Sequence, residues 1–573
     1  MNCSNNRNAA KPLRMGIMCN GLVFKEWQFQ CINSILSLGF VKPVILIIDQ
    51  SRCEKSSTFK KITVAITRLK LILFYIYSAI ICKPCVYGDI DIRKILADTP
   101  SIYCQVHKKG KFSEYFSQND IDTIRSYHLD FILRFGFGII RGDIHSTARY
   151  GIWSFHHDDE TKYRGAPPCF WEIYNGDTIT GAVLQRLIDR LDAGIVLQKG
   201  YLRTIKHSYA KNIDQVYRHA AKWPSKVCID IHNGVADYLD DRPSLTTAPI
   251  YRTPTNLQML LFMTKIIKNK FMRLNALFHY DQWNVALVHE PIHKFLSGNP
   301  KSMPVWLHTP KCNHFLADPF GIEEKTGITI LCEDYSYHQQ KGHISSIQIS
   351  NAGIFSAAQP VIQEPFHLSY PYLFTHNGTV YCVPEAQQSH EISLYRSPNF
   401  PYKWEKVTTL VAGLSVVDPT LFKYAGTWWL MCSEAGTSCN LLIWYASALS
   451  DPWQPHANNP VKTDIRSARP AGTPFIHQGA LYRPAQDCSK TYGGRIVINR
   501  VKRLSSIQYM EEEVSFIEPY SDSLFPDGLH TIASAGNNAT LIDGKRSIFS
   551  PSLFASTMMT LASRAWKKRT KSS

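Results

Sequence analysis

The sequence predicts two folded domains of different class: an open parallel-sheet α/β domain over residues 1–250, and an all-β, five-bladed propeller over residues 301–550. Two observations carry this prediction. The first 50 residues alternate an apolar strand, a helix and a second apolar strand, as in a βαβ unit. From Trp306 onward, paired short strands recur about every 50 residues, which is the period of propeller blades.

Length and composition agree with this division. A chain of 573 residues is too long for one hydrophobic core. The net charge of +17 indicates an anionic partner, such as a membrane, nucleic acid or a phosphorylated substrate. The polar N-terminus has no apolar stretch typical of a secretory signal. We therefore expect a cytoplasmic protein, peripheral on the inner face of the plasma membrane.

The cysteines favour the same location. Cys19, Cys332, Cys382 and Cys432 fall inside apolar strands, which predicts reduced thiols in the core of a cytosolic protein. The single Cys-x-x-Cys, at residues 82–85, has no second pair to complete a zinc site, so we expect no metal there.

The first domain is predicted element by element. Residues 15–20 form a strand, residues 25–38 a helix with apolar residues at helical spacing, and residues 44–48 a second strand. Both strands are continuous apolar runs, as expected of buried parallel strands. A glycine-rich dinucleotide fingerprint is absent after the first strand. Residues 129–140 predict a strand and turn that lead into a strand over residues 152–156.

Residues 61–82 form the most apolar stretch, but its uncharged part begins only at Leu71. A spanning helix needs about 20 apolar residues. The stretch therefore predicts a helix that either packs on the domain or lies at a membrane surface, and the sequence leaves both possibilities open.

A basic amphipathic linker is predicted over residues 251–300. Apolar residues alternate with lysines and Arg273 across residues 255–283. No acidic residue lies between Arg252 and Asp281. Such a helix is typical of an interfacial helix on anionic lipid, and the alternative is a linker helix packed between domains. The basic tail, residues 551–573, repeats this composition.

In the second domain, each block contains two strands, and the second strand of a block ends in an acid. The acids expected to bind substrate are Asp318 and Asp418 in first strands, and Glu385, Glu434 and Asp487 at the ends of second strands. Because the inner strands of a propeller line one central channel, we expect these side chains to converge there.

Residues 153–194 carry a specific pattern. Trp153-Ser154-Phe155-His156 is followed by Arg164-Gly165, then Thr180-Gly181, then an Asp192-Ala-Gly turn. This order resembles the catalytic core of the folate-dependent formyltransferases, where Asn-x-His, Arg-Gly, Thr-Gly and Leu-Asp-Thr-Gly follow one another. Ser154 stands where that family has its Asn, and an acidic loop replaces its Ser-Leu-Leu-Pro.

The resemblance implies a formyltransferase-like fold with 10-formyltetrahydrofolate as donor. It implies that His156 polarises the formyl oxygen and that Asp192 orients this histidine and relays a proton. Ser154 stands in for an oxyanion donor, whose loss typically costs a factor of about 10²–10³ in rate. Ser154 therefore indicates a water-bridged variant, a different transferred group or a weakened enzyme. Arg164, Gly165 and Asp158 are the expected substrate-binding residues of this domain. The acidic loop, residues 158–160, is interpreted either as a solvated turn or as a site for a cationic amine or, with His157, a metal.

The second domain resembles two groups of proteins. The stretches that carry the resemblance include His367-Leu-Ser-Tyr-Pro-Tyr, Asp451-Pro-Trp-Gln-Pro-His and Ala468-Arg-Pro-Ala-Gly. They are similar to the propeller half of plant glucosamine inositolphosphorylceramide transferases, and the repeat resembles five-bladed arabinanase and xylosidase propellers. The resemblance implies a glycan or glycolipid ligand.

The combined expectation is a membrane-associated transferase that formylates an amino sugar on a nucleotide- or lipid-linked cell-envelope glycan. Alternatives are a glycoside hydrolase using Asp318, Asp418 and Glu434, another group transferase, or a non-catalytic glycolipid-binding protein. Nucleic acid is not an expected partner, because the basic residues lie on apolar helices rather than among stacking aromatics.

Overall fold

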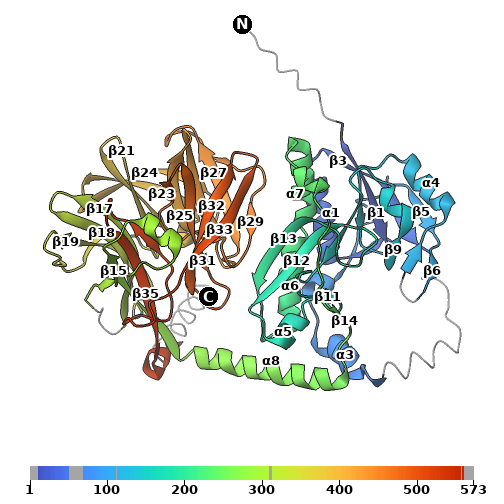
Figure 1. Cartoon of the computed structure of the whole chain (residues 1–573), viewed down its shortest axis with the longest axis horizontal. Coiled ribbons are helices and arrows are strands. Elements are labelled where there is room, and N and C mark those ends of the chain that lie inside the picture. Colours follow the sequence, from blue (N-terminus) through green and yellow to red (C-terminus); the bar gives the residue numbers. More distant parts are fainter. Residues whose placement is uncertain (1–10, 51–68, 111–112, 309–312, 556–557, 560–573) are drawn as a thin grey trace, which may run out of the picture. The chain divides into compact units, whose positions relative to one another are not determined.

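The computed structural model describes residues 11–50, 69–110, 113–308, 313–555 and 558–559. The chain divides into two units, Met1–Lys270 and Phe271–Ser573. Figure 1 colours them from blue to green and from green to red, and each is described by itself. Most of the predicted basic tail and the start of the apolar stretch at residues 61–68 lie outside the described residues.

The first unit is built on a seven-stranded sheet. Its strands are β1 (Leu13–Cys19), β3 (Val41–Asp49), β5 (Ser101–Cys104), β8 (Phe131–Arg134), β10 (Ile152–His156), β12 (Ile179–Arg186) and β13 (Ile195–Arg203). Their order is β13-β12-β10-β8-β1-β3-β5. The five strands from β10 to β5 are parallel, which confirms the predicted α/β class, whereas β12 and β13 add an antiparallel edge.

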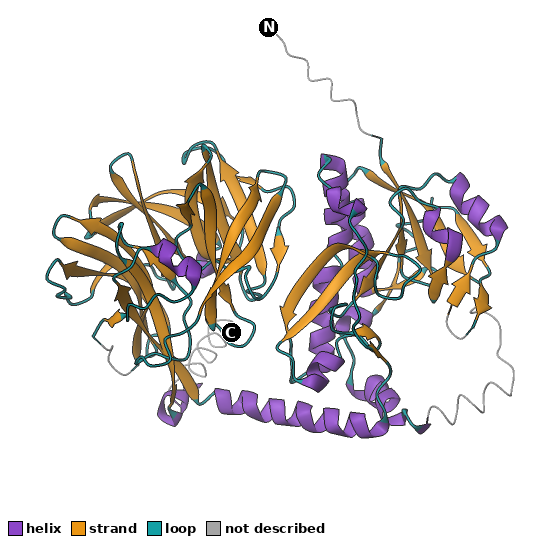
Figure 2. Cartoon of the chain, viewed as in Figure 1, coloured by secondary structure: helices purple, strands orange, loops and turns teal. Residues whose placement is uncertain are grey.

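Figure 2 shows the helices in purple. Those of the first unit are α1 (Glu26–Leu36), α3 (Ile72–Ile76), α4 (Gln118–Ser126), α5 (Trp171–Asn175), α6 (Tyr209–Ala220) and α7 (Trp223–Asn233). The helix α8 (Asn256–Ala276) begins in the first unit and ends in the second. α4 buries Ile121 and Ile124 in one core with Ile132 and Ile152 of the sheet. Because side chains alternate along a strand, Ser154 and His156 lie on the same face of β10 as Ile152.

Short pairings complete the first unit. They are β2 (Val23–Lys25) with β4 (Asp89–Asp91), β11 (Arg164–Gly165) with β14 (Ile250–Tyr251), and β6 (His107–Lys109) with β7 (Ser113–Tyr115) and β9 (Ile139–Arg141). The predicted apolar helix is present as α3 followed by one π-helical turn, η1 (Tyr77–Ile81). Among the helices that the structure describes, none is long and apolar enough to cross a bilayer.

The second unit contains five antiparallel sheets in its described part. Four of them are β17 (His314–Glu324), β18 (Gly327–Ser336), β19 (Lys341–Ser350) and β20 (Gln359–Ile362); β21 (Ser369–His376), β22 (Thr379–Glu385), β23 (Glu391–Asn399) and β24 (Lys403–Ala412); β25 (Val416–Tyr424), β26 (Thr427–Glu434), β27 (Asn440–Ala446), β28 (Gln454–Pro455) and β29 (Lys462–Thr463); and β30 (Phe475–His477), β31 (Ala480–Asp487), β32 (Arg495–Leu504) and β33 (Tyr509–Ile517).

The fifth sheet joins the beginning and the end of this unit. It combines β15 (His279–Val288) and β16 (Val305–Trp306) with β34 (Ile532–Ser534) and β35 (Thr540–Phe549). β15 pairs with β35 along its whole length. The predicted start of the all-β domain at residue 301 is therefore too late, and Trp283 lies in a strand rather than in the predicted helix. The four cysteines expected in apolar strands are buried, as predicted.

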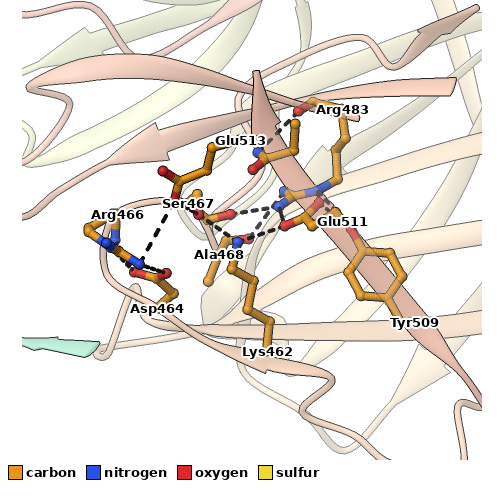
Figure 3. Close-up of polar contacts among 10 residues, drawn as sticks. Lys462, Asp464, Arg466, Ser467, Ala468, Arg483, Tyr509, Glu511 and Glu513 are labelled. Carbon is orange, nitrogen blue, oxygen red and sulfur yellow. Dashed lines mark hydrogen bonds and ion pairs between the residues drawn. The ribbon is translucent and has the colours of Figure 1, made fainter. Parts of the chain in front are cut away.

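A buried ion-pair network links β31 and β33 through Arg483 and Glu511 (Figure 3). The Arg483 guanidinium, 1% exposed, donates to Glu511 at 2.7 Å and 2.9 Å. Lys462 Nζ lies 2.8 Å from the same carboxylate, and the Tyr509 hydroxyl also donates to it. Burial alone would raise the pKa of Glu511, but Arg483 and Lys462 outweigh it and lower this pKa to about 2.

This network predicts acid-dependent stability. A depressed carboxylate pKa stabilises the fold above the unfolded value of 4.5, and this contribution is lost as the pH falls from 4.5 to about 2. Glu511→Gln leaves Arg483 without its counter-charge, so we expect it to lower the free energy of unfolding at neutral pH by about 3 kcal/mol. Urea unfolding at pH 7 and pH 3 measures this effect, which should shrink at the lower pH.

The control is Glu512→Gln, since Glu512 is half-exposed and pairs with Lys502 at the surface. Exposed pairs contribute about 0–1 kcal/mol. Equal losses of stability for the two variants would contradict a dominant role for the buried pair.

Candidate functional sites

His156 ends β10, at the carboxyl edge of the parallel strands where open α/β sheets place their sites. Its Nε2 lies 2.7 Å from the Tyr163 carbonyl oxygen, and its Nδ1 lies 3.7 Å from Asp192 Oδ1. Because a carbonyl can only accept, Nε2 carries a hydrogen and Nδ1 is the nitrogen that faces Asp192. The structure therefore brings together the predicted histidine and aspartate, at a distance longer than a direct hydrogen bond.

Asp192 is held by the Arg-Gly pair. Its backbone lies in the left-handed region, with φ 47°, and its Oδ2 accepts a hydrogen bond from Gly165 N–H at 3.0 Å. Gly165 has φ 93°, and a Cβ there would lie 2.2 Å from the Tyr251 carbonyl oxygen. Arg164 Nη2 donates to Leu191 O at 2.8 Å. Arg164 and Gly165, predicted to bind substrate, thus contact and position the Asp192 loop.

Ser154 is buried and accepts a hydrogen bond from Arg134 Nη1 at 2.9 Å. Arg134 ends the neighbouring strand β8, and its Nη2 donates to the Gly138 carbonyl. Arg134, Ser154 and Asp192 line one cavity of about 70 Å³. Sequence reasoning missed Arg134, although a lone charge at the end of an apolar strand was a usable signal.

The acidic loop after His156 has protein partners throughout. Asp159 and Glu160 bind Lys199 Nζ at 2.8 Å and 2.9 Å. Asp158 accepts a hydrogen bond from Cys169 N–H at 2.6 Å, and burial, followed by the nearby Glu172, raises its pKa well above the usual range. The predicted solvated turn is thus wrong. Asp158 is only 3% exposed, so a substrate could not reach it in this conformation.

His157 does not join the acidic loop as a metal ligand. Its ring stacks on Tyr217 with centroids 3.5 Å apart, and burial lowers its pKa to about 3. A neutral histidine in an aromatic stack is a packing residue here.

The second unit has a repeated backbone feature. Asp318, Tyr370 and Asp418 each precede a proline, and each has a positive φ, of 53°, 42° and 53°. The pairing register shifts at each of these positions, as at a β-bulge. Bulges of this kind re-aim side chains, and strained backbone of this kind is concentrated at functional sites.

The re-aimed side chains meet buried groups from other sheets. Asp318 accepts from the Thr531 hydroxyl at 2.7 Å. The Tyr370 hydroxyl accepts from Gly472 N–H at 2.7 Å. Asp418 accepts from Gln486 at 2.8 Å and is paired with Arg469. Asp543 of β35 in the fifth sheet also accepts a hydrogen bond from Asp318 N–H, so strands of all five sheets contribute to one cluster, which we name the acidic centre.

The acidic centre contains five buried carboxyl groups. They belong to Asp318, Glu333, Glu385, Asp418 and Asp543. Burial raises the pKa of Asp318 to about 6, and burial followed by neighbouring carboxylates raises the pKa values of Glu333 and Glu385 well above their usual range. Such an arrangement can hold protons or attract cationic and hydroxyl-bearing ligands.

Two predicted acids, Glu434 and Asp487, do not belong to the acidic centre. In the first two of these sheets, the acids of the centre are Glu333, which pairs across the sheet with Ala317, and Glu385, which pairs with Ser369. Ala317 and Ser369 each precede a re-aimed residue. The corresponding residue in the third sheet is Ser433, which pairs with Val417. Glu434 is one position further on, is exposed and accepts from Asn440 at 2.8 Å. A shift of one residue turns a side chain to the opposite face of a strand.

Asp487 also lies one position away from the residue that reaches the acidic centre. Its neighbour Gln486 donates to Asp418, whereas Asp487 pairs with Arg495 at 2.9 Å. The hydrolase set of Asp318, Asp418 and Glu434 is therefore not brought together. Glu333, Asp543 and His530 were not predicted as site residues, although Glu333 and Asp543 close the apolar runs of their repeated sequence blocks.

One group in the described residues has the geometry of a cation site. Ligand atoms of Asp318, His530 and Asp543 lie within 4.8 Å of one another. His530 Nδ1 lies 2.5 Å from Asp543 Oδ2, and its Nε2 lies 3.6 Å from Asp318 Oδ1. Burial opposes charge on His530, but Asp543 and Asp318 raise its pKa. These two carboxylates favour the protonated form of His530, whose positive charge would lie where a metal ion could otherwise bind.

Residues 306–522 match the family model described as "Glucosamine inositolphosphorylceramide transferase 1, N-terminal". Glucosamine inositolphosphorylceramide transferase 1 of Arabidopsis thaliana is 34% identical over 212 residues, which cover 36% of this chain and 28% of the relative. Methionyl-tRNA formyltransferase of Agathobacter rectalis is 30% identical over 121 residues, 21% of this chain and 39% of that protein. The chain thus spans between 28% and 39% of the length of these curated relatives.

Solved structures similar to parts of the chain fall into two groups. A family 117 glycoside hydrolase of Zobellia galactanivorans shares 13% identity with a TM-score of 0.31, covering 48% of this chain and 92% of that one. Phosphoribosylglycinamide formyltransferase of Anaplasma phagocytophilum shares 15% identity with a TM-score of 0.26, covering 39% and 89%.

The fit around Gly165 gives a direct test of the first site. Gly165→Ala adds a clash with Tyr251 to an unfavourable φ, so we expect it to lower the free energy of unfolding by about 2–4 kcal/mol and to displace Asp192. Gly176→Ala is the matched control, because Gly176 also has a positive φ but no atom within 4 Å of the added Cβ. We expect about 1 kcal/mol for this control. Chemical denaturation of both variants provides the comparison, and equal losses would contradict the tight fit at Gly165.

Proposed function

We propose that the protein is a transferase whose α/β unit moves a formyl group from 10-formyltetrahydrofolate to the amine of an amino sugar. In this proposal the amino sugar belongs to a nucleotide- or lipid-linked cell-envelope glycan. We interpret the five sheets of the second unit as propeller blades whose acidic centre binds the glycan or glycolipid acceptor. The observation that carries the proposal is the placement of Asp192 beside His156, with Arg164-Gly165 holding the loop.

Formyl transfer forms a bond between the acceptor nitrogen and the formyl carbon and breaks the bond from that carbon to the donor nitrogen. The attacking amine loses a proton, and the leaving nitrogen gains one. In the proposal Asp192 and His156 move this proton, since one carboxylate and one imidazole nitrogen face each other. The tetrahedral intermediate carries an oxyanion that needs hydrogen-bond donors.

We assign the missing donor to Arg134. Ser154 offers a single hydroxyl hydrogen, but the Arg134 guanidinium beside it is a charged donor, and both line the cavity with Asp192. Charged donors form stronger hydrogen bonds to an oxyanion than neutral amides do. In this assignment the Arg134–Ser154 pair takes the place of the formyltransferase Asn.

Binding of a stable 10-formyltetrahydrofolate analogue tests the proposal. We expect saturable binding in the micromolar range, about −8 kcal/mol, which His156→Ala and Asp192→Ala weaken at least tenfold. Asp189→Ala is the control, because this residue lies on the same loop and is exposed. Titration calorimetry with the full chain gives the affinities, and no binding at millimolar analogue would overturn the proposal.

A second candidate, a non-catalytic glycolipid-binding protein, is favoured by the size of the cavity. About 70 Å³ holds the reacting end of a donor but not its body, and ligand pockets commonly measure about 300–1,000 Å³. Two measurements separate the candidates. Loss of formyl transfer in Arg134→Ala, with glycolipid binding retained, supports the transferase. Glycolipid binding by a wild-type protein that does not bind the analogue supports the second candidate.

A further inference from the structure

Two segments far apart in the sequence lie side by side in the first unit. Asn256, at the start of α8, accepts from Leu73 N–H at 3.1 Å and donates through its side chain to Leu69 O at 2.8 Å. The rings of Tyr77 in η1 and Phe262 in α8 also meet, with centroids 5.9 Å apart. Figure 1 shows α3 at the N-terminal end of α8. α3, η1 and the first turns of α8 thus form one surface element.

Only one side of this element packs on the domain. Met259, Phe262 and Ile266 are the buried residues of α8, and Phe262 stacks on Phe170 with centroids 4.2 Å apart. The remaining apolar residues are not needed for this contact, so the domain core does not explain them.

The other side exposes large apolar side chains, between 41% and 68% accessible. They are Leu69, Ile72, Tyr75, Ile76, Ile80 and Ile81 on the first segment, and Leu257, Leu260, Leu261 and Ile267 on the second. We call this set the apolar platform. Scattered exposed apolar residues are ordinary, but a group of this size on adjoining segments is typical of an interaction site.

The two segments that carry the apolar platform contain charges of one sign, although Asp214 of α6 accepts a hydrogen bond from Val86 N–H beyond Ile81. Residues 69–88 and 253–280 contain no acidic residue, while Lys70, Lys83, Lys268 and Lys270 lie among the apolar positions. Each basic residue near an anionic leaflet contributes about 1 kcal/mol. A helix with apolar and basic residues lies in the plane of such a leaflet, with its apolar side chains among the acyl chains.

We infer that the apolar platform is a membrane-surface site that docks the α/β unit on an anionic lipid leaflet through two segments, α3–η1 and α8. The sequence indicated such a role for the basic helix and left residues 71–82 open between packing and membrane contact. The exposure of Ile80 and Ile81 beside α8 extends the site to this second segment. The inference does not depend on the proposed chemistry.

Co-sedimentation of the full chain with vesicles tests the inference. Phosphatidylcholine vesicles that contain phosphatidylserine should bind the protein, and pure phosphatidylcholine vesicles or raised salt should weaken binding at least tenfold. The double variants Ile80→Ser/Ile81→Ser and Leu257→Ser/Leu260→Ser should each lower partitioning about tenfold or more. Lys268→Glu/Lys270→Glu should abolish the preference for the anionic vesicles.

The control is Ile476→Ser/Leu524→Ser, which removes two exposed apolar residues of the second unit and should leave binding unchanged. Circular dichroism and thermal melting verify that each variant is folded. Platform variants that bind like the wild type would overturn the inference. So would a wild-type protein that ignores vesicles but forms a dimer that the platform variants abolish, because the surface would then join two copies of the chain.

Discussion

Left-handed backbone at non-glycine residues is the constraint on which both candidate sites depend. Asp192, Asp318, Tyr370 and Asp418 all adopt a positive φ, at a cost of about 1–3 kcal/mol each. Such backbone conformations persist only where contacts with neighbouring residues hold them in place. Gly165 N–H fixes Asp192, while prolines and register shifts fix the three residues of the second unit. The same strain that is unfavourable for folding directs these side chains into the two sites.

Burial of charge is the second constraint, and it is only partly met by ion pairs. In the first unit Lys199 pairs with Asp159 and Glu160, whereas burial raises the pKa values of the neighbouring Asp158 and Glu172. In the acidic centre the carboxyl groups outnumber the cationic partners Arg469 and His530. The raised pKa values of Asp318, Glu333 and Glu385 follow from this imbalance, because protonation is the remaining way to neutralise buried carboxylates.

Sequence patterns identified what depends on local order. The α/β class and the strand that ends at His156 follow from periodicity, whereas the pairing of His156 with Asp192 was implied by the resemblance of residues 153–194 to the folate-dependent formyltransferases. Non-local and one-residue effects were missed. β15 belongs with β35, more than 200 residues later, and no local pattern records that pairing. Glu434 and Asp487 occupy the predicted strand ends but face away, because the repeat period does not determine on which face an acid lies. Arg134 lies on the neighbouring strand β8, 20 residues before Ser154, and no local pattern records the contact between the two side chains.

In the proposed function, His156, Asp192, Ser154 and Arg134 form the acyl-transfer site, and the acidic centre binds the sugar-bearing acceptor. Arg134 and Ser154 together receive the oxyanion in this proposal. The most direct test is a crystal structure of the full chain with a stable 10-formyltetrahydrofolate analogue. We expect the reacting carbonyl oxygen to lie within hydrogen-bond distance of the Arg134 guanidinium and the Ser154 hydroxyl, with Asp192 beside the formyl carbon. An analogue bound elsewhere, with Arg134 still bonded to Ser154 and Gly138, would contradict the proposal.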